Sequence, residues 1–286
     1  MTAPSATVAA HAKVNLVLRV MAREPNGYHR IETAFQRLAL ADDVTVAVVA
    51  GSRTLDAAWV EGSGDLGPVE RNLAYRAAVA YADAAAWPAG WQITLRKRIP
   101  AGAGLGGGSS DAAAVLRALN RLSPKPLALG ALCALGGTLG ADVPFFVRDV
   151  SLAIGRGYGE ELTALPPLPP ARVMLLVPAY PIATAGAYAA LDAHRGSAPL
   201  AHRAPLVARD FADWHSVAGK QANDFEEVVF AMHPDLGAAR RAFEKGGADV
   251  ARLSGSGSVV FGAWAGKEMP EVAERGGARV LTTATV

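Results

Sequence analysis

The feature that most constrains this chain is a glycine-rich segment at residues 99–113, IPAGAGLGGGSSDAA. Five of the seven residues at 102–108 are glycine, and two serines separate them from an amphipathic stretch at 111–122. Glycine tolerates positive φ and lets a backbone N–H approach a ligand without a Cβ in the way. At the start of a helix, unpaired N–H groups and the helix dipole favour an anion. The segment therefore predicts a polyphosphate site, in which Ser109 and Ser110 cap the helix and one hydroxyl lies near Mg²⁺.

Three other interpretations of this segment are weaker. A flexible Gly/Ser linker does not normally lie between a strand and an amphipathic helix. Gly102, Gly104 and Gly107 spell G-x-G-x-x-G, but the acidic residue expected about 20 positions further on would fall in LALGALCAL, which has none. No lysine follows the glycines, as a Walker A loop requires. A dinucleotide-binding oxidoreductase and a non-catalytic nucleotide sensor remain as alternatives from other classes.

Composition narrows the class of protein. The 286 residues suit one large domain or two of ordinary size, and 51% of them are hydrophobic. The net charge of +2 gives no electrostatic reason to expect a binder of nucleic acid or of a membrane surface. The single cysteine, Cys133, forms no internal disulfide, and no apolar run approaches the length of a bilayer span. A cytoplasmic protein is expected.

Apolar periodicity and turn residues predict a mixture of strands and helices. Pro25-Asn26-Gly27 marks a tight hairpin, residues 51–70 suggest a second hairpin, and Asn72 is placed to cap a helix. The expected strands lie at 7–20, 43–49, 91–99 and 173–177, and the expected helices at 72–86, 111–122 and 127–139. The spacing is not that of a doubly wound sheet, so the predicted class is α+β. The proline-rich segment 165–172 is the expected domain junction.

Six segments in sequence order carry a family resemblance: AKVNLVLRV, NGYHRIET, IPAGAGLGGGSSDAA, LGADVPFF, NDFE and LSGSGSVVFG. Together they resemble the GHMP kinases, and the resemblance runs from about residue 10 to residue 262. It implies a two-domain architecture with the active site in the cleft between the domains. Residues 1–165 would form an N-terminal ATP-binding domain, and residues 166–286 a C-terminal domain.

The resemblance also implies a set of ATP-binding residues. Asn72 and Leu73 match the adenine-pocket segment, and Lys97 lies where it would reach the nucleotide, although a solvated strand face is the alternative for the run Arg96–Arg98. Ser110 is the expected Mg²⁺ ligand together with the phosphates, and Asp111 is expected to do no more than cap. The remaining residues of the expected phosphate loop are Pro100, Ala101, Gly102, Ala103, Gly104, Leu105, Gly106, Gly107, Gly108 and Ser109.

Two charged residues are implied as catalytic. Asp142, in GADVPFF, matches the segment that holds the family's catalytic aspartate, where it would act as a base or as an orienting carboxylate. From its residue type alone, a helix cap is the alternative. Lys13 would keep Asp142 ionised and help to neutralise the transferring phosphoryl group. Without the resemblance, a lone lysine in a strand faces solvent more often than not.

The acceptor site is implied by residues from both halves of the chain. Tyr28 and His29 would grip a cytosine, and Asn15 lies on the same strand face as Lys13. Thr184 would supply a hydroxyl, and Tyr188 a second ring that completes the sandwich around the base. Residues 254–258, SGSGS, suggest either a close backbone approach to the phosphate loop or a plain hairpin turn.

The expected function is ATP-dependent phosphorylation of a hydroxyl on a cytidine diphosphate-linked methylerythritol, in the non-mevalonate route to isoprenoid precursors. The alternative within the family is a kinase for another small alcohol, such as a sugar, homoserine or mevalonate. The expected cofactors are ATP and Mg²⁺. The sequence leaves the oligomeric state open.

Overall fold

The computed structural model describes residues 3–62, 64–196, 202–220, 223–272, 274 and 276–286. Its backbone forms two compact units, each of which is discontinuous in sequence because strands β1 and β2 contribute to both. Unit 1 comprises Met1–Ala12, Leu40–Ala101 and Gly106–Val150, and unit 2 comprises Lys13–Ala39, Gly102–Leu105 and Ser151–Val286. The sequential division at residue 165 stays a prediction.

The strands are β1 (Ser5–Arg23), β2 (His29–Val49), β3 (Arg53–Trp59), β4 (Gly90–Lys97), β5 (Leu152–Arg156), β6 (Glu161–Leu165), β7 (Ala171–Val177), β8 (Val250–Leu253), β9 (Val260–Ala265) and β10 (Arg279–Ala284). The α-helices are α1 (Leu73–Ala85), α2 (Gly107–Leu122), α3 (Leu129–Gly137), α4 (Val143–Arg148), α5 (Thr184–Arg195), α6 (Trp214–Ala218), α7 (Glu226–Met232) and α8 (Pro234–Lys245). Short 3₁₀ helices lie at Val69–Arg71 and Ala208–Phe211. The α+β prediction is confirmed.

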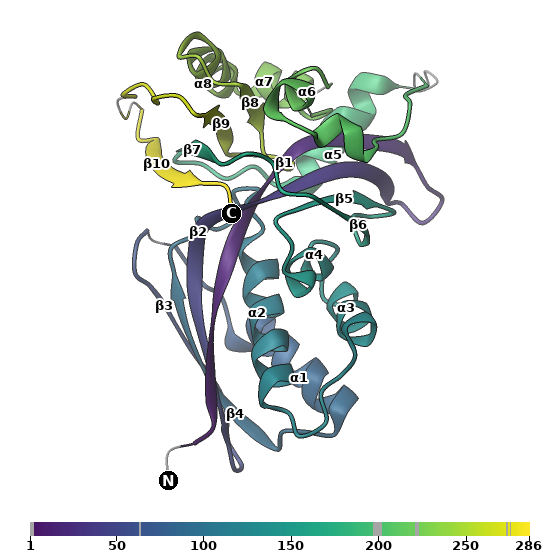
Figure 1. The fold of residues 1–286 in the computed structure, drawn as a ribbon, viewed down its shortest axis with the longest axis vertical. Coiled ribbons are helices and arrows are strands. Elements are labelled where there is room, and N and C mark those ends of the chain that lie inside the picture. The colour runs from purple at the N-terminus through teal and green to yellow at the C-terminus, as the bar shows by residue number, and fades with distance from the viewer. Residues whose placement is uncertain (1–2, 63, 197–201, 221–222, 273, 275) are drawn as a thin grey trace. The chain divides into compact units, whose positions relative to one another are not determined.

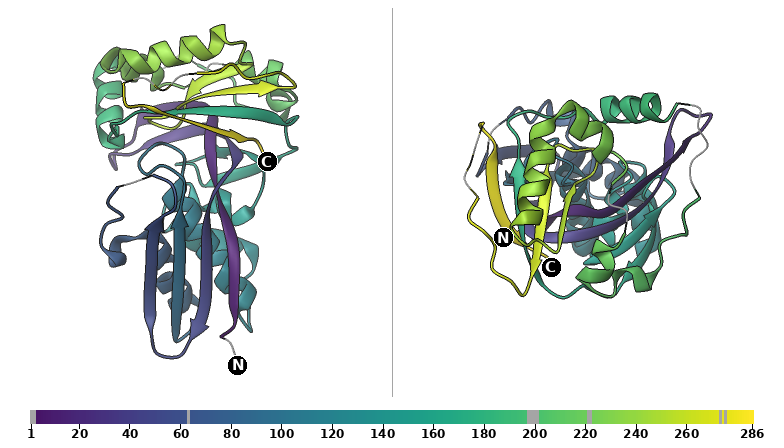
Figure 2. Two further views of the ribbon diagram at one scale, coloured as in Figure 1. Left: turned by 90° about the vertical axis from the view of Figure 1, so that its left-hand side faces the viewer. Right: turned by 90° about the horizontal axis from the view of Figure 1, so that it is seen from above.

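In unit 1, helices α1 to α4 cover one face of a sheet in which β4 lies between β3 and the second half of β2 (Figures 1 and 2). Trp91, Ile93 and Leu95 of β4 are buried while Gln92 between them is exposed, so the alternation in the sequence marks the core face. The second predicted hairpin, at 51–70, is wrong. Strand β3 pairs in parallel with β4, with α1 between them, and does not pair back onto β2.

The predicted start of the first helix is confirmed, and the predicted start of the second is wrong. Asn72 caps α1 as expected, since its side chain accepts a hydrogen bond of 2.9 Å from the Ala74 N–H. Helix α2 begins at Gly107, four residues before the expected start, and its N-cap is Gly106 with φ of 72°. The prediction that Ser109 and Ser110 cap α2 is therefore wrong. Both serines lie inside the first turn and a half, because the left-handed glycine has already turned the chain into the helix.

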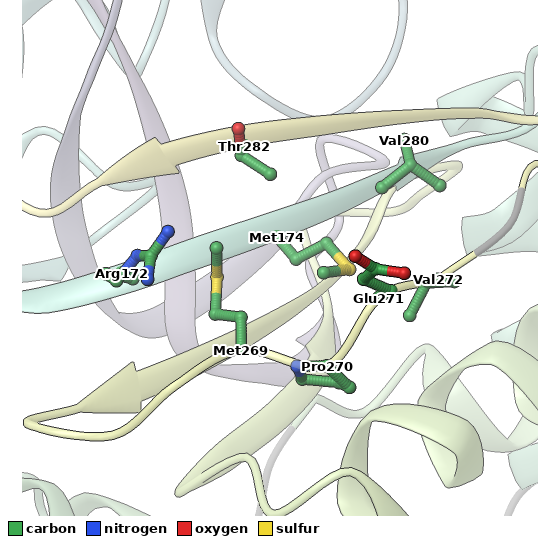
Figure 3. Close-up of a pocket in the computed structure, with 8 residues that line it drawn as sticks. All are labelled: Arg172, Met174, Met269, Pro270, Glu271, Val272, Val280 and Thr282. Atoms are coloured by element: carbon green, nitrogen blue, oxygen red, sulfur yellow. The ribbon is translucent and has the colours of Figure 1, made fainter.

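Unit 2 contains an antiparallel sheet in the order β10-β7-β9-β8, with α8 packed across it (Figures 1 and 2). Phe243 of α8 meets Trp264 of β9 edge to face, with their ring centroids 5.7 Å apart, inside a core that also takes in Leu253 and Val260. The close-up in Figure 3 shows a hollow in this unit, where Met174 of β7 and Val280 of β10 lie opposite Met269.

Unit 2 also contains the second half of β1, the first half of β2, strands β5 and β6, and helices α5 to α7. Thr33 to Gln36 of β2 pair with β5, which in turn pairs with β6. The expected turn at Pro25-Asn26-Gly27 is confirmed: Gly27 has φ of +86°, and the Glu24 N–H donates to the Tyr28 carbonyl at 2.8 Å. Strand β2 is far longer than the strand predicted at 43–49. Most of its first half is buried on both faces, so this part does not show the alternation of buried and exposed positions on which the prediction relied. Among the described helices, none has the length and apolar character that a membrane crossing requires.

Candidate active site

The first part of the glycine loop, Gly102–Leu105, belongs to unit 2 and is held there through its carbonyl groups. The Ala103 carbonyl accepts from the Val259 N–H at 3.3 Å, and the Leu105 carbonyl accepts from the Lys13 N–H at 3.0 Å. Between them, the Gly104 carbonyl accepts from the Ser254 hydroxyl at 2.8 Å. Three successive carbonyls are thus satisfied by protein donors, which fixes the course of the loop beside β1 and the turn at 254–258.

Gly104 is required at its position for two reasons. Its φ is +76°, and a Cβ placed there would lie 2.2 Å from the Ser254 carbonyl oxygen. The turn at 254–258 joins β8 to β9 and at the same time presses its backbone against the loop, so both interpretations offered for SGSGS hold. Asn223 supports that turn by donating from Nδ2 to the carbonyls of Leu253 and Gly255, at 2.9 and 2.7 Å.

The second part of the loop enters α2 in unit 1 with its donors unpaired. Within the described part of the chain, the backbone N–H groups from Gly106 to Ser109 donate no hydrogen bond, and the first donor of the helix is Ser110, to the Gly106 carbonyl at 2.9 Å. Leu73 lies at this helix start, since its Cδ1 is 3.5 Å from the point where Gly108 would carry a Cβ. The structure thus brings Leu73, from the expected adenine-pocket segment, to the helix start that the sequence marks as an anion site.

Lys97 lies beneath that helix start in a buried cluster of three charges. Its ammonium bonds Asp42 and, at 2.6 Å, Asp111 of α2, and all three side chains are at most 6% exposed. Asp42 also accepts from the backbone N–H groups of Arg98 and Ile99, where β4 ends and the loop begins. The cluster therefore ties β2, β4 and α2 together at the point where the loop leaves the sheet.

The cluster holds two carboxylates for one ammonium, and the pKa values follow from this. Burial raises the pKa of Asp111 to about 7; Lys97 opposes the rise, and Asp42 adds to it. Burial alone would lower the pKa of Lys97, but the two carboxylates outweigh it, so the pKa of Lys97 is raised.

Asp111 does not cap α2, contrary to the expectation. Of the run Arg96–Arg98, the two arginines are partly exposed and pair with Asp56 and Asp43, and only Lys97 is buried.

Lys13 is not the surface residue that its type alone favours. It is 4% exposed, its Nζ donates to the Oδ1 of Asn15, and it lies 5.5 Å from the centre of the Phe35 ring. Asn15 donates onward to the Thr33 hydroxyl at 2.7 Å, and this hydroxyl donates to the Val17 carbonyl. The expectation that Lys13 and Asn15 share a face of β1 is confirmed, and the chain of bonds fixes the direction of both side chains.

Asp142 immediately precedes α4 in unit 1. Its side chain makes no capping hydrogen bond, which leaves the helix-cap alternative without support. The segment before it approaches the start of α2, because the Ser109 hydroxyl lies 3.7 Å from the point where Gly140 would carry a Cβ. Asp142 is half-buried and lies two residues after Gly140, so the fold of unit 1 holds it near the first turn of α2.

The expected base-binding residues gather in unit 2. His29 is stacked on Tyr188 of α5, with ring centroids 4.9 Å apart, and its Nε2 lies 2.7 Å from the Oδ1 of Asp192. Tyr28 is 69% exposed, and its ring packs edge-on against Tyr158 at 6.1 Å. An exposed ring beside a buried and oriented imidazole suits a flat heterocycle, which needs a face to stack on and a polar partner at its edge.

Thr184 opens α5 and lies 3.1 Å, hydroxyl to hydroxyl, from Ser256. This contact connects the start of α5 to the turn at 254–258, and so to the loop residues that the turn supports. Tyr188 lies one helical turn further along α5 and packs edge-on against Phe225 at 4.8 Å. The structure thus brings the predicted site residues at 184–188 next to residues from three other segments of unit 2.

Sequence reasoning missed four residues of the site. Thr33 and Asp42 carried no signal, because each acts through a partner distant in sequence. Tyr158 binds the 24–28 turn through its hydroxyl, which donates to Glu24 and accepts from Asn26, both at 2.7 Å. Asp192 follows Tyr188 at a spacing of four on a helix, and this spacing was the one usable signal. The described residues contain no group of three or more His, Cys, Asp or Glu side chains able to hold a metal ion.

Comparison with known proteins places the chain in a family. The model for the GHMP kinases N terminal domain matches residues 72–149, and the model for the GHMP kinases C terminal domain matches residues 203–275. The chain belongs to the GHMP kinase family, whose members are ATP-dependent kinases, and the resemblance carried by its sequence motifs is confirmed.

Particular relatives share one name. The chain is 40% identical over 264 residues to the 4-diphosphocytidyl-2-C-methyl-D-erythritol kinase of Moorella thermoacetica, a match that covers 90% of this chain and 89% of that protein. It is 38% identical over 281 residues to the kinase of the same name from Geobacter metallireducens, covering 98% and 95% of the two chains.

Solved structures agree with these relatives. A crystal structure of a 4-(cytidine 5'-diphospho)-2C-methyl-D-erythritol kinase superposes with a TM-score of 0.73 at 36% identity, covering 98% of this chain and 99% of that one. A mevalonate kinase from L. major superposes with a TM-score of 0.68 at 13% identity, covering 100% and 98%. At that identity the second match speaks for the shared fold alone.

Proposed function

We propose that this chain transfers the γ-phosphoryl group of ATP to the 2-hydroxyl of 4-diphosphocytidyl-2-C-methyl-D-erythritol, giving the 2-phosphate and ADP. The observation that carries the proposal is the 40% identity, over 90% of the chain, with a kinase of that name. The geometry of the two units supports the same reaction, because each offers a site suited to one of the two substrates.

The nucleotide is assigned to the glycine loop. The unpaired N–H groups from Gly106 to Ser109 and the dipole of α2 would hold the phosphates, and Leu73 and Asn72 would border the adenine. The remaining loop residues, from Pro100 to Leu105, would line the phosphates with backbone. Lys97 is assigned to the same side, beneath the first turn of α2.

Asp142 and Lys13 are assigned to the chemistry. Asp142 would accept the proton of the acceptor hydroxyl, or orient that hydroxyl, and Lys13 would offset the negative charge of the transferring group. Two observations support these roles: Lys13 is a buried ammonium held by Asn15, and the carboxylate of Asp142 is not used as a cap.

Magnesium fits as an ion that arrives with the nucleotide. Mg²⁺ keeps several waters and is commonly held by one or two protein groups together with substrate phosphates, not by an all-protein cage. A serine in the first turns of α2 supports this arrangement. Ser110 is the assigned ligand, and the ion would supply positive charge to the phosphates.

The cytidine part of the acceptor is assigned to an aromatic cluster of unit 2, formed by Tyr28, His29, Tyr188 and the neighbouring Tyr158. Tyr28 would stack on the base, His29 would bind its edge, and Tyr188 would close the second side. Asn15 and Thr184 would bind hydroxyl or phosphate oxygens of the acceptor. An exposed ring next to a fixed imidazole favours an acceptor that carries a base over an acceptor without one.

A coupled assay of ADP release tests the substrate. We expect turnover with the cytidyl substrate, and little with mevalonate, homoserine or galactose at equal concentration. Turnover with one of the other alcohols and none with the cytidyl substrate would replace the proposed acceptor while leaving a kinase. ATP binding without any turnover would instead favour a nucleotide sensor.

Replacing Asp142 tests the chemistry. Asp142→Asn keeps the size of the side chain and removes its charge, so we expect kcat to fall by about 100-fold or more with the ATP affinity nearly unchanged. Asp149→Asn is the matched control, because Asp149 ends the same helix and pairs on the surface with Arg117. Near-normal turnover of Asp142→Asn would remove this residue from the mechanism.

A further inference from the structure

The His29 side chain is fixed in unit 2 by two contacts of different kinds. One face of the imidazole lies on the ring of Tyr188, with an angle of 25° between the planes. Its Nε2 meets the Asp192 carboxylate at 2.7 Å, and the imidazole is only 5% exposed. A stacked face and a bonded nitrogen together leave the ring little freedom to turn.

Both contacts come from one face of one helix. Tyr188 and Asp192 are four residues apart on α5 and therefore point the same way. The helix is anchored independently of His29, since Tyr188 packs on Phe225 and Ala187 and Leu191 are buried in the core of unit 2. The position of the carboxylate is thus set by the fold and not by the histidine it meets.

The contact determines which nitrogen carries the proton. An ionised carboxylate only accepts hydrogen bonds, so the Nε2 of His29 must be the donor. In the neutral imidazole the other nitrogen, Nδ1, then carries a lone pair and acts as an acceptor. Across the described residues, the His29 side chain has no hydrogen bond besides the one to Asp192, and Nδ1 is not among the buried unpartnered atoms, so Nδ1 remains available to a ligand.

We propose that Asp192 is a specificity-determining residue, which holds His29 as a hydrogen-bond acceptor and so makes the site select a pyrimidine that bears an amino group over one that bears a carbonyl. This inference rests on the proposed function. The exocyclic amino group of cytosine donates a hydrogen bond to an acceptor at the base edge. The corresponding carbonyl of uracil offers only lone pairs there and leaves two acceptors facing each other.

The expected discrimination follows from the cost of that mismatch. A buried polar group left without its partner costs about 1–3 kcal/mol, which corresponds to about 5- to 150-fold in kcat/KM. If Asp192 is removed, the proton of His29 can move to Nδ1, and the ring can then donate to the uracil carbonyl. Discrimination between the two bases should therefore shrink while the enzyme stays active.

The test compares Asp192→Ala with wild type on the cytidyl substrate and on its uridine diphosphate-linked analogue. We expect the ratio of kcat/KM for the two substrates to fall at least about tenfold, through KM of the acceptor, with KM for ATP unchanged. Alanine is the best helix former and Asp192 lies at the surface of α5, so the variant retains the helix. An unchanged ratio would overturn the inference.

Glu227→Ala is the matched control. Glu227 of α7 forms another His–carboxylate pair that involves α5, with His194 at 3.2 Å, but both of those side chains are exposed. We expect this variant to keep the wild-type ratio. A loss of discrimination equal to that of Asp192→Ala would mean that disturbing α5 is sufficient, and would also overturn the inference.

Nitrogen-15 NMR of His29 supplies a readout independent of activity. We expect the wild-type imidazole to carry its proton on Nε2, and Asp192→Ala to show a mixture of the two tautomers. A wild-type imidazole with its proton on Nδ1 would overturn the inference. The two proposals fail separately: absence of wild-type turnover on the cytidyl substrate refutes the proposed function, whereas normal turnover with unchanged base discrimination in Asp192→Ala refutes only the role of Asp192.

Discussion

The glycine loop and the aromatic cluster of unit 2 are built by opposite means. At the loop, the groups proposed to bind the nucleotide are backbone amides, and the path of the backbone depends on the absence of a side chain, as at Gly104. In the aromatic cluster, every group offered to a ligand is a side chain, and each is oriented by another side chain, as His29 is by Asp192. The loop is one continuous segment, while the cluster combines the start of β2 with α5 and the turn around Tyr158.

This difference predicts how each region responds to substitution. A backbone site fails when the chain cannot follow its path, either because an added side chain blocks it or because the buried charges that support it are no longer balanced. A side-chain site loses binding in proportion to the contact removed, and it leaves the other substrate unaffected. The predictions below test this contrast, from the largest expected effect to the smallest.

Removing the buried ammonium under the loop should have the largest effect. Lys97→Met leaves Asp42 and Asp111 buried without a counter-charge, and breaking a buried ion pair in this way costs about 3–5 kcal/mol. Chemical denaturation measures the loss in the free energy of unfolding. Arg98→Met is the control, because its pair with Asp43 is partly exposed and should cost about 1 kcal/mol or less. Equal losses in the two variants would mean that the cluster adds nothing special to the loop.

The second largest effect is expected from adding a methyl group to the loop at Gly104. Gly104→Ala places a Cβ 2.2 Å from the Ser254 carbonyl at a φ of +76°, so the loop must leave its path. We expect affinity for a nonhydrolysable ATP analogue, measured by calorimetry, to fall about 100-fold, on the order of the effect of losing one hydrogen-bond donor to an anionic group in an enzyme site. Gly130→Ala is the control, because nothing lies within 4 Å of its Cβ position in α3. An unaffected Gly104→Ala would show that the backbone path is not required.

The exposed ring of the aromatic cluster should give a smaller and selective effect. Tyr28→Ala removes a stacking face worth about 1–3 kcal/mol, so KM for the cytidyl substrate should rise about tenfold or more while KM for ATP stays constant. Tyr158→Phe should raise the same KM less, because it keeps the ring beside Tyr28 and removes only the hydroxyl contacts to Glu24 and Asn26. Steady-state kinetics with each substrate varied in turn measures both. Parallel increases in both KM values would contradict the separation of the two regions.

The smallest effect concerns pH and the charge cluster beneath the loop. The pKa of Asp111 is raised from 3.8 to about 7 in the folded protein, so the folded state binds the proton more tightly than the unfolded one. Its contribution to stability is complete below about pH 4 and is lost as the pH rises through 7. The free energy of unfolding should therefore decline over this range in wild type, and decline less in Asp111→Asn. Identical slopes in the two proteins would show that Asp111 does not hold a proton next to Asp42 and Lys97.

Much of the fold could be predicted from local patterns in the sequence. Alternation in β4 and the capping asparagine before α1 predicted the elements that they belong to, because each signal lies within the element itself. The partner of β3 was not predictable in this way. A strand shows which residues it buries but not which strand lies beside it, and the segment at 53–59 pairs in parallel with a strand that follows a whole helix later.

The candidate site also has a part that local sequence predicts and a part that only tertiary packing decides. By itself, the sequence determined where the glycine loop lies and that a helix follows it, since glycine content and a following helix are local properties of one segment. Only the tertiary structure decided that Lys97 is held between Asp42 and Asp111, that Ser254 supports Gly104, and that Asp192 orients His29. These contacts join residues up to 163 positions apart, and such pairs form only because packing of whole strands and helices brings them within hydrogen-bond distance.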